Sequence, residues 1–365
     1  DISANLSGTG DIQLTSADVN QEIEIGSTDA ADLNLTATEL AFLQDGWNSI
    51  TIGGSDHEGK IEVNENVSFS DHTYIRNDLS YDATVDKAID INASITTSDS
   101  ADLYLYGRAN SLSTHGYDGV NVSANLNIAR DLYVQSGSGA SDAVINSSLT
   151  QVGRDFILRS GNNSAIYNDL IVGRDLDIIH STNNSAYQMY LHAGTIDVAG
   201  YISIAQSNTG KLRQLANSIL EADGNITITA NDVDLDSTAQ IRSGSGTSTL
   251  TFLETGENAD MELGGTSQGA SWQMETAEFD TIQDGFSSVV FGSSSYIGDL
   301  YITGALNAGT NDLIFKADEI DISANMSGTG DIQFTSADVN QEIEIGSTDA
   351  ADLNLTATEL GFLQD

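Results

Sequence analysis

Apolar and polar residues alternate in short runs from the start of the chain. The first runs lie at residues 11–14, 22–25 and 32–35. Alternation with a period of two places the apolar side chains on one face of a β-strand and the polar ones on the other. Gly, Ser, Asn and Asp separate the runs, and these residues favour turns. The pattern predicts an all-β protein built from short strands.

The strands of the middle region recur at a nearly constant spacing. An apolar–Arg–Asp–apolar pattern appears at residues 126–134, 152–158 and 171–178. Later alternating runs follow at 201–204, 225–228 and 249–252. Spacings of about 20–26 residues fit one coil of a parallel β-helix, in which successive coils pair at about 4.8 Å. We therefore predict a β-solenoid with inward rows of Ile, Leu, Val and Phe.

One segment departs from the alternation. Leu212, Leu215 and Ile219 lie at i, i+3 and i+7, which is helical spacing. Residues 211–219 therefore form either a short helix inserted at a corner or the approach to a strand that begins at 218–220.

The longest-range pattern is a repeat. Residues 1–45 return as residues 321–365, and the positions that differ are Leu6/Met326, Leu14/Phe334 and Ala41/Gly361. Residues 1–320 thus form one full period, and residues 321–365 begin the next. Such repeats indicate an architecture that grows by stacking. We expect the chain to belong to a longer tandem array, with about 14 coils and a rise of roughly 65 Å per period.

An older duplication lies inside the period. Residues 22–53 are echoed at 260–292, where Asp284-Gly285 corresponds to Asp45-Gly46. Asp-Gly is a turn dipeptide in which glycine supplies a positive φ. The two aspartates are alternatively calcium ligands, but a turn explains both copies more simply.

The charge of the chain is extreme. It has 12 basic and 54 acidic residues, which gives a formal net charge of −42. Nucleic acids and anionic membranes attract clustered Lys and Arg, so this composition argues against both as partners. A disordered acidic chain is the alternative to a folded one, and the regular alternation of apolar residues disfavours it.

Proline and cysteine are both absent. At the usual proline frequency of roughly 5%, about 18 prolines would be expected in this length. Proline has no N–H to donate, so a ladder-rich β structure excludes it. Without cysteine there is no disulfide framework and no zinc–thiolate site. No apolar run of about 18 residues and no signal peptide is recognised, so we expect no membrane insertion of this segment.

The most distinctive charged groups are the pairs Arg130-Asp131, Arg154-Asp155 and Arg174-Asp175. If the coils stack in register, these side chains form neighbouring rows of opposite sign. One hypothesis is an exposed salt-bridged row, in which each pair contributes about 0–1 kcal/mol. The other is a sugar-acid site, because β-helix polysaccharide lyases combine arginine with calcium-bound carboxylates. Regular recurrence favours the stacked row.

Other signals for a metal site are weaker. Asp232, Asp234 and Asp236 resemble the start of an EF-hand loop, but the glycine and the terminal glutamate of that loop are missing. Val233 and Leu235 interleave the three aspartates, which favours an outward strand face. Weak calcium binding between stacked acidic rows is the one cofactor hypothesis that the sequence supports.

The sequence predicts no catalytic residue and no cofactor-binding residue. The histidines, at positions 57, 72, 115, 180 and 192, lie far apart and show neither metal nor triad spacing. Asp56-His57-Glu58 is expected to be a solvated loop between glycines. No GxSxG elbow and no phosphate-binding glycine loop occurs.

Two stretches carry a resemblance to a known family. Residues 222–230, ADGNITITA, and residues 43–53, LQDGWNSITIG, resemble the repeats of very large bacterial surface proteins of the filamentous-haemagglutinin type. The resemblance covers most of the chain through degenerate strand patterns. It implies a right-handed parallel β-helix, export to the bacterial cell surface and a role as a stalk, fibre or adhesin.

We therefore predict a non-catalytic structural segment of a long extracellular filament or adhesin. Its expected partners are other copies or periods of itself, joined end to end or bundled, together with surface glycans or another cell. The alternative is a β-helical protein that binds or cleaves polysaccharide, of the lyase or tailspike type. The long tandem period argues against this alternative, because an enzyme gains nothing from repeating its scaffold with its site.

Overall fold

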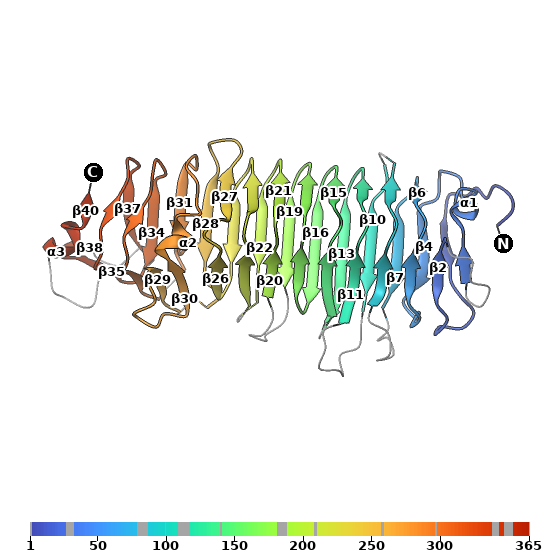
Figure 1. Ribbon diagram of the computed structural model, residues 1–365, viewed down its shortest axis with the longest axis horizontal. Coiled ribbons are helices and arrows are strands. Elements are labelled where there is room, and N and C mark those ends of the chain that lie inside the picture. The colour runs from blue at the N-terminus through green and yellow to red at the C-terminus, as the bar shows by residue number, and fades with distance from the viewer. Residues whose placement is uncertain are drawn as a thin grey trace. The chain divides into compact units, whose positions relative to one another are not determined.

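The computed structural model of the chain describes residues 2–26, 33–78, 87–98, 100–108, 117–138, 141–180, 188–207, 210–256, 259–295, 298–337, 343–346 and 353–364. They divide into two compact units. Unit 1 comprises residues 1–182 with 194–197, and unit 2 comprises residues 183–193 with 198–365. Parallel strand pairs dominate each unit, as Figure 1 shows.

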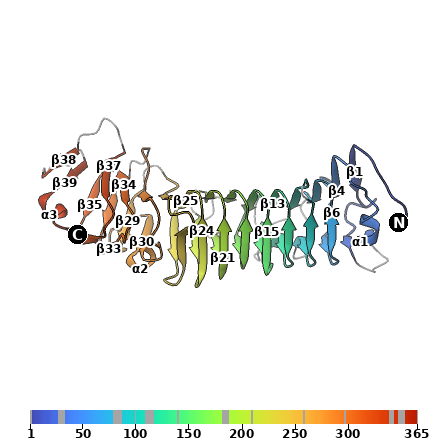
Figure 2. The ribbon, with the colours of Figure 1, turned by 90° about the horizontal axis from the view of Figure 1, so that it is seen from above.

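Unit 1 winds so that the coils in its middle contribute one strand to each of three parallel sheets (Figure 1; Figure 2). The first sheet contains, in spatial order, β1 (Asp11–Leu14), β4 (Ser49–Gly54), β7 (Thr73–Asn77), β10 (Leu103–Gly107), β13 (Leu132–Ser138), β16 (Phe156–Gly161) and β19 (Leu176–His180). The second contains β3 (Leu33–Leu35), β2 (Ile23–Ile25), β5 (Ile61–Val63), β8 (Lys87–Ile91), β11 (Tyr117–Val122), β14 (Ser141–Ile145) and β17 (Ser164–Ile166). The third contains β6 (Val67–Phe69), β9 (Ile95–Thr97), β12 (Leu126–Ile128), β15 (Leu149–Val152), β18 (Asp169–Val172) and β21 (Gly194–Val198).

Unit 2 continues the same kind of winding with shorter sheets. Its longest sheet contains β22 (Ile202–Ala205), β25 (Ile226–Thr229), β28 (Thr249–Leu253), β31 (Ser288–Phe291), β34 (Leu313–Ala317) and β37 (Ile332–Ser336). Two further groups are β20 (Gln188–Leu191), β23 (Lys211–Gln214) and β26 (Asp232–Leu235), and β24 (Ser218–Ala222) with β27 (Gln240–Ser243). The remaining groups are β30 (Trp272–Glu275), β29 (Met261–Gly264), β32 (Leu300–Ile302) and β35 (Ile320–Ile322); β33 (Leu306–Asn307), β36 (Met326–Ser327) and β40 (Leu363–Gln364); and β38 (Ile343–Ile345) with β39 (Leu353–Leu355).

The prediction of a parallel β-helix is confirmed, and so is the coil length in the region that suggested it. Strands β13 and β16 pair at an offset of 24 residues, and β16 and β19 at an offset of 20. Other coils are shorter or longer than this range. The offset is 19 residues between β34 and β37, 30 between β7 and β10, and 39 between β28 and β31. The extra residues lie in connections outside the paired strands, so the ladder keeps its register while the loops vary.

Stacked rows of inward side chains form the core of each unit. In unit 1, Leu132 lies in register with Phe156, and both are fully buried. In unit 2, Phe252, Phe291 and Phe315 occupy one register position on successive strands, with ring centroids 5.3 and 5.8 Å apart. Because strand neighbours lie about 4.8 Å apart, identical inward residues can stack ring on ring.

The repeated motif around residue 38 contains a helical turn that the sequence alternation did not predict. Helix α1 (Ala37–Leu40) begins with a capping box between Thr36 and Glu39, and buries Leu40. Helices α2 (Thr276–Phe279) and α3 (Ala357–Leu360) occupy the equivalent places in the diverged copy and in the second period. The predicted Asp-Gly turns are confirmed by the positive φ of the glycines that follow these helices, 121° at Gly46 and 113° at Gly285.

The helical alternative for residues 211–219 is wrong. This segment forms β23 and then the start of β24, as the strand alternative predicted. Asn217, with a φ of 61°, turns the chain between the two strands. Leu212 is buried and pairs with Met189, so ladder contacts decide the conformation over the weak helical spacing.

Candidate functional site

The outward face of the first sheet of unit 1 carries three parallel rows of polar and aromatic side chains. Register pairing places equivalent residues of β7, β10, β13 and β16 beside one another. Adjacent strands lie about 4.8 Å apart, so each row presents one side chain per coil at that interval. These rows hold the candidate chemistry of unit 1.

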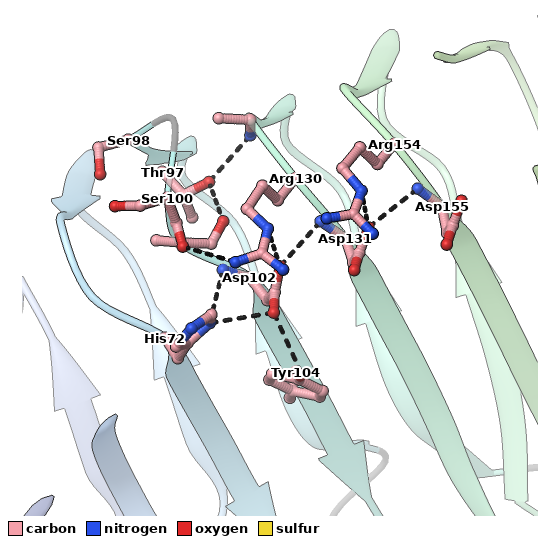
Figure 3. Close-up of polar contacts among 12 residues, drawn as sticks. His72, Thr97, Ser98, Ser100, Asp102, Tyr104, Arg130, Asp131, Arg154 and Asp155 are labelled. Carbon is pink, nitrogen blue, oxygen red and sulfur yellow. Dashed lines mark hydrogen bonds and ion pairs between the residues drawn. The ribbon is translucent and has the colours of Figure 1, made fainter. Parts of the chain in front are cut away.

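The first row is the arginine–aspartate ladder, which consists of Asp102, Arg130, Asp131, Arg154, Asp155 and Arg174 (Figure 3). Each arginine faces the aspartate of the preceding coil. Arg130 Nε lies 3.4 Å from Asp102 Oδ1, and Arg154 Nε lies 3.4 Å from Asp131 Oδ1. Arg174 pairs in the same way with Asp155.

Backbone contacts run through the same ladder. The N–H of Asp131 donates to Asp102 Oδ1 at 3.1 Å, and the N–H of Asp155 donates to Asp131 Oδ1 at 3.2 Å. Asp102 and Asp131 are buried, so the arginine and the amide together stabilise a carboxylate that has lost most of its water. The ladder therefore joins coils by side chains in addition to the strand hydrogen bonds.

The ladder begins at His72 in Figure 3. His72 Nδ1 lies 3.0 Å from Asp102 Oδ2, and the hydroxyl of Tyr104 donates to the same oxygen at 3.3 Å. The prediction of neighbouring rows of opposite sign is thus confirmed, with each pair formed between coils. Because carboxylates already occupy the guanidinium groups, Arg130, Arg154 and Arg174 do not offer open positions for a sugar acid.

The second row is a stack of tyrosines. Tyr74, Tyr104 and Tyr133 are in register, and their ring centroids are 4.3 and 4.5 Å apart with nearly parallel planes. Burial raises the pKa of Tyr104, and the negative charge of Asp102 raises it further. The stacked phenols are therefore neutral at physiological pH and pack on one another along the outside of the sheet.

The third row borders an open hollow, which we call the Tyr106 groove. It is defined by Arg76, Asp78, Tyr106, Arg108, Gln135 and Arg159. Arg76, Tyr106, Gln135 and Arg159 share one register position across four strands. The hollow measures about 520 Å³ between Tyr74 and Gly137, and a smaller one of about 140 Å³ adjoins it between Tyr106 and Arg159.

The charges of the Tyr106 groove differ from those of the ladder. Arg76 Nε donates to Asp78 Oδ2 at 2.7 Å, and its guanidinium lies 6.0 Å from the centre of the Tyr106 ring. Arg108 and Arg159 are exposed, and neither side chain forms an ion pair with any described residue. Burial raises the pKa of Tyr106, so its hydroxyl is a neutral donor at physiological pH.

The sequence hypothesis singled out the wrong arginines for an open site. It followed the recurring Arg-Asp dipeptides, which the fold pairs internally, and passed over Arg108 and Arg159. A usable signal was present in the Tyr-x-Tyr run at 104–106. Aligning the strands that contain Tyr74, Tyr104 and Tyr133 by coil places Arg76, Tyr106 and Arg159 in one row.

The predicted outward strand face at residues 232–236 is confirmed. Val233 and Leu235 are buried, while Asp232 and Asp234 lie in register with Lys211 and Arg213. Arg213 pairs with Asp234 at 2.6 Å, and Lys211 pairs with Asp232. Opposite charges on adjacent strands stabilise the pairing of β23 with β26.

Three glutamates in unit 1 form the acidic cluster closest to the calcium hypothesis. Carboxylate oxygens of Glu22, Glu24 and Glu62 lie within 4.8 Å of one another. Lys60 pairs with Glu62 and partly neutralises the cluster. Weak calcium binding stays a prediction.

The prediction that His57 is solvated is wrong. His57 is only 2% exposed, because the N–H groups of Glu58 and Gly59 both donate to the carbonyl of Val19 and hold this loop against the first repeat copy. Burial lowers the pKa of His57. His180, at the end of β19, is equally buried, and burial lowers its pKa to about 4. His115 lies outside the described residues.

We expect His180 to make unit 1 sensitive to mild acid. Its folded pKa of about 4 lies below the unfolded value of about 6.5, so the folded state resists protonation. Stability is therefore full above pH 6.5 and falls as the pH drops toward 4, by about 3 kcal/mol. Urea unfolding at several pH values, compared between the parent chain and His180→Gln, measures this loss. A variant with the same pH dependence as the parent would contradict the assignment to His180.

No family model, curated protein or solved structure matches the chain. Among the described residues, no helix has the length and apolar character needed to cross a membrane.

Proposed function

We propose that this chain is a non-catalytic structural segment of a long extracellular filament or adhesin of the bacterial cell surface. Its mechanical role would be to carry load along stacked coils and to hold other parts of the assembly at a distance. The observation that supports this proposal most directly is the equivalence of the two repeat copies, one in each unit. Each copy is folded by the same internal contacts.

The strand contacts of the two copies correspond one to one. Leu6 bridges Leu43 in the first copy, as Met326 bridges Leu363 in the second. Likewise, β2 pairs with β3 in the same register in which β38 pairs with β39. The sequence of the repeat therefore carries enough information to fold the same way in two settings.

The helix contacts also correspond. Thr36 and Glu39 form a capping box, as do Thr356 and Glu359. The Glu39 carboxylate accepts the N–H of Ile2 at 3.0 Å, and the Glu359 carboxylate accepts the N–H of Ile322 at 3.2 Å. These contacts tie the start of each copy to its helix.

The surroundings of the two copies are complementary. The first copy is followed by coils, since β4 pairs with β1 and β5 pairs with β2. The second copy is preceded by coils, since β34 pairs with β37 and β33 pairs with β36. One repeat sequence thus accepts a neighbouring coil on both sides, which is what a continuous tandem solenoid requires.

The side chains that wait for a following coil are visible in the second copy. Ile23 and Ile25 are fully buried beneath β5, whereas the equivalent Ile343 and Ile345 are 51% and 73% exposed. We infer that residues equivalent to β5 cover this surface in the next period. The acidic composition would keep such a fibre soluble and separate from its neighbours.

A chain of two periods tests the proposal. We expect residues 1–365 followed by a second copy of residues 46–320 to form one uninterrupted solenoid. Cryo-electron microscopy should show strands about 4.8 Å apart along the long axis and an axial repeat of roughly 65 Å. Separate globules joined by a flexible break would contradict continuous stacking. A matched chain with Ile343→Lys and Ile345→Lys should show the break.

A further inference from the structure

The Tyr106 groove is a positively charged place on an acidic protein. The chain as a whole has 54 acidic against 12 basic residues. Along the groove, Arg76, Arg108 and Arg159 face a single carboxylate, that of Asp78. Since this excess runs against the overall composition, the fold has gathered these arginines locally.

The arginines in the groove are open where those of the ladder are closed. Every arginine of the arginine–aspartate ladder faces a carboxylate of the preceding coil. Arg108 and Arg159 form no ion pair with a described residue, and the planar guanidinium can bind a carboxylate through two parallel N–H donors. Their natural ligand is therefore an anion that comes from outside this chain.

The remaining residues of the groove suit a sugar. Tyr106 offers a half-buried ring and a neutral hydroxyl, and Gln135 offers an exposed amide between it and Arg159. Aromatic rings with a polar tip pack against the apolar faces of sugars while their hydroxyls form hydrogen bonds. The row crosses successive strands at intervals of about 4.8 Å, so it can meet a chain of repeating units that lies across the strands.

We propose that the Tyr106 groove binds an anionic polysaccharide, with the acid groups of successive sugars on Arg76, Arg108 and Arg159. Tyr106 and Gln135 contact the sugar between these groups. The partner is identified by its chemistry as a chain of sugar acids. This binding does not depend on the proposed filament role, because every residue of the groove belongs to unit 1.

Binding of defined polygalacturonate oligomers tests the proposal. We would measure it by calorimetry at an ionic strength of about 0.15 M, where a Debye length of about 8 Å screens repulsion from distant carboxylates. The fully methyl-esterified oligomer, which has the same sugars without the charges, is the matched ligand. We expect the acidic oligomer to bind and the ester to bind at least about tenfold more weakly.

Four variants separate this site from general electrostatics. Arg108→Gln and Arg159→Gln should each weaken binding by about tenfold, since each removes one charge-assisted contact. Asp78→Asn should strengthen binding, because it frees Arg76 from its internal carboxylate; a gain of this kind cannot result from misfolding. Arg242→Gln, which removes an equal charge from unit 2, should leave binding unchanged.

The outcomes are decisive in both directions. Absence of binding, equal binding of the ester, or an equal loss in Arg242→Gln and Arg159→Gln would overturn the proposal. A sulfated oligomer of equal length serves as a second probe. If the sulfated oligomer binds through the same arginines and the polygalacturonate does not, the ligand class is a sulfated sugar and the assignment to sugar acids is wrong.

Discussion

Residues 1–320 alone, without the second repeat copy, are expected to assemble end to end into fibres. Removal of residues 321–365 uncovers the last coil of the period, including Leu313 and Phe315, which are 1% and 0% exposed in the 365-residue chain. Residues 1–45 of a second molecule have nearly the sequence that covers them there. Association therefore rebuilds an existing contact, and a head-to-tail contact that does not close extends without limit.

The 365-residue chain should assemble far less readily. The free face of its second copy needs residues equivalent to β5, and in another molecule β5 is already paired with β2. An exchange would displace one copy to seat another, with no net gain in buried apolar area. Sedimentation velocity over a range of concentrations distinguishes the two chains. Fibres of 1–320 should disappear with Ile12→Lys, whose side chain would face the uncovered Leu313. Monomeric 1–320 with native circular dichroism would refute the prediction.

The fold was predictable because the solenoid repeats one simple physical rule. Alternating runs mark strands, and a spacing near 24 residues brings runs such as 132–138 and 156–161 into register. The variable coils were harder, because loop residues obey no period. Helix α1 shows a different limit. Its turn is defined by the reciprocal hydrogen bonds of Thr36 and Glu39, which interrupt the alternation over only four residues.

The charged rows were only half predictable. Recurring Arg-Asp dipeptides correctly indicated stacked opposite charges, but the sequence could not tell that Arg154 faces Asp131 of the preceding coil and not its own neighbour Asp155. That choice depends on where each strand begins relative to the next. The same three-dimensional detail leaves Arg159, five residues further on, without a carboxylate. Openness of an arginine is a property of the packed face and is invisible in the local sequence.

The largest effect of a single substitution is expected at Phe291. Its ring is fully buried and lies between Phe252 and Phe315, with Trp272 edge-on at 6.2 Å. Phe291→Ala removes a ring from the middle of the stack and leaves a cavity that the flanking strands cannot close while they keep their register. We expect the free energy of unfolding of unit 2 to fall by about 3–5 kcal/mol. Urea unfolding followed by Trp272 fluorescence, in a Trp47→Phe background, measures unit 2 by itself.

Phe334→Leu is the matched control for this substitution. Phe334 is the next ring of the same stack, 5.6 Å from Phe315, and the first repeat copy carries Leu14 at the equivalent position. Since leucine is already tolerated there and the site is only half-buried, we expect a loss of about 1 kcal/mol. Equal losses in the two variants would mean that the stack does not stabilise unit 2 through its buried centre. A larger loss at Phe291 places the main resistance to unfolding in the interior rings, and the repeat copy then contributes mainly by covering them.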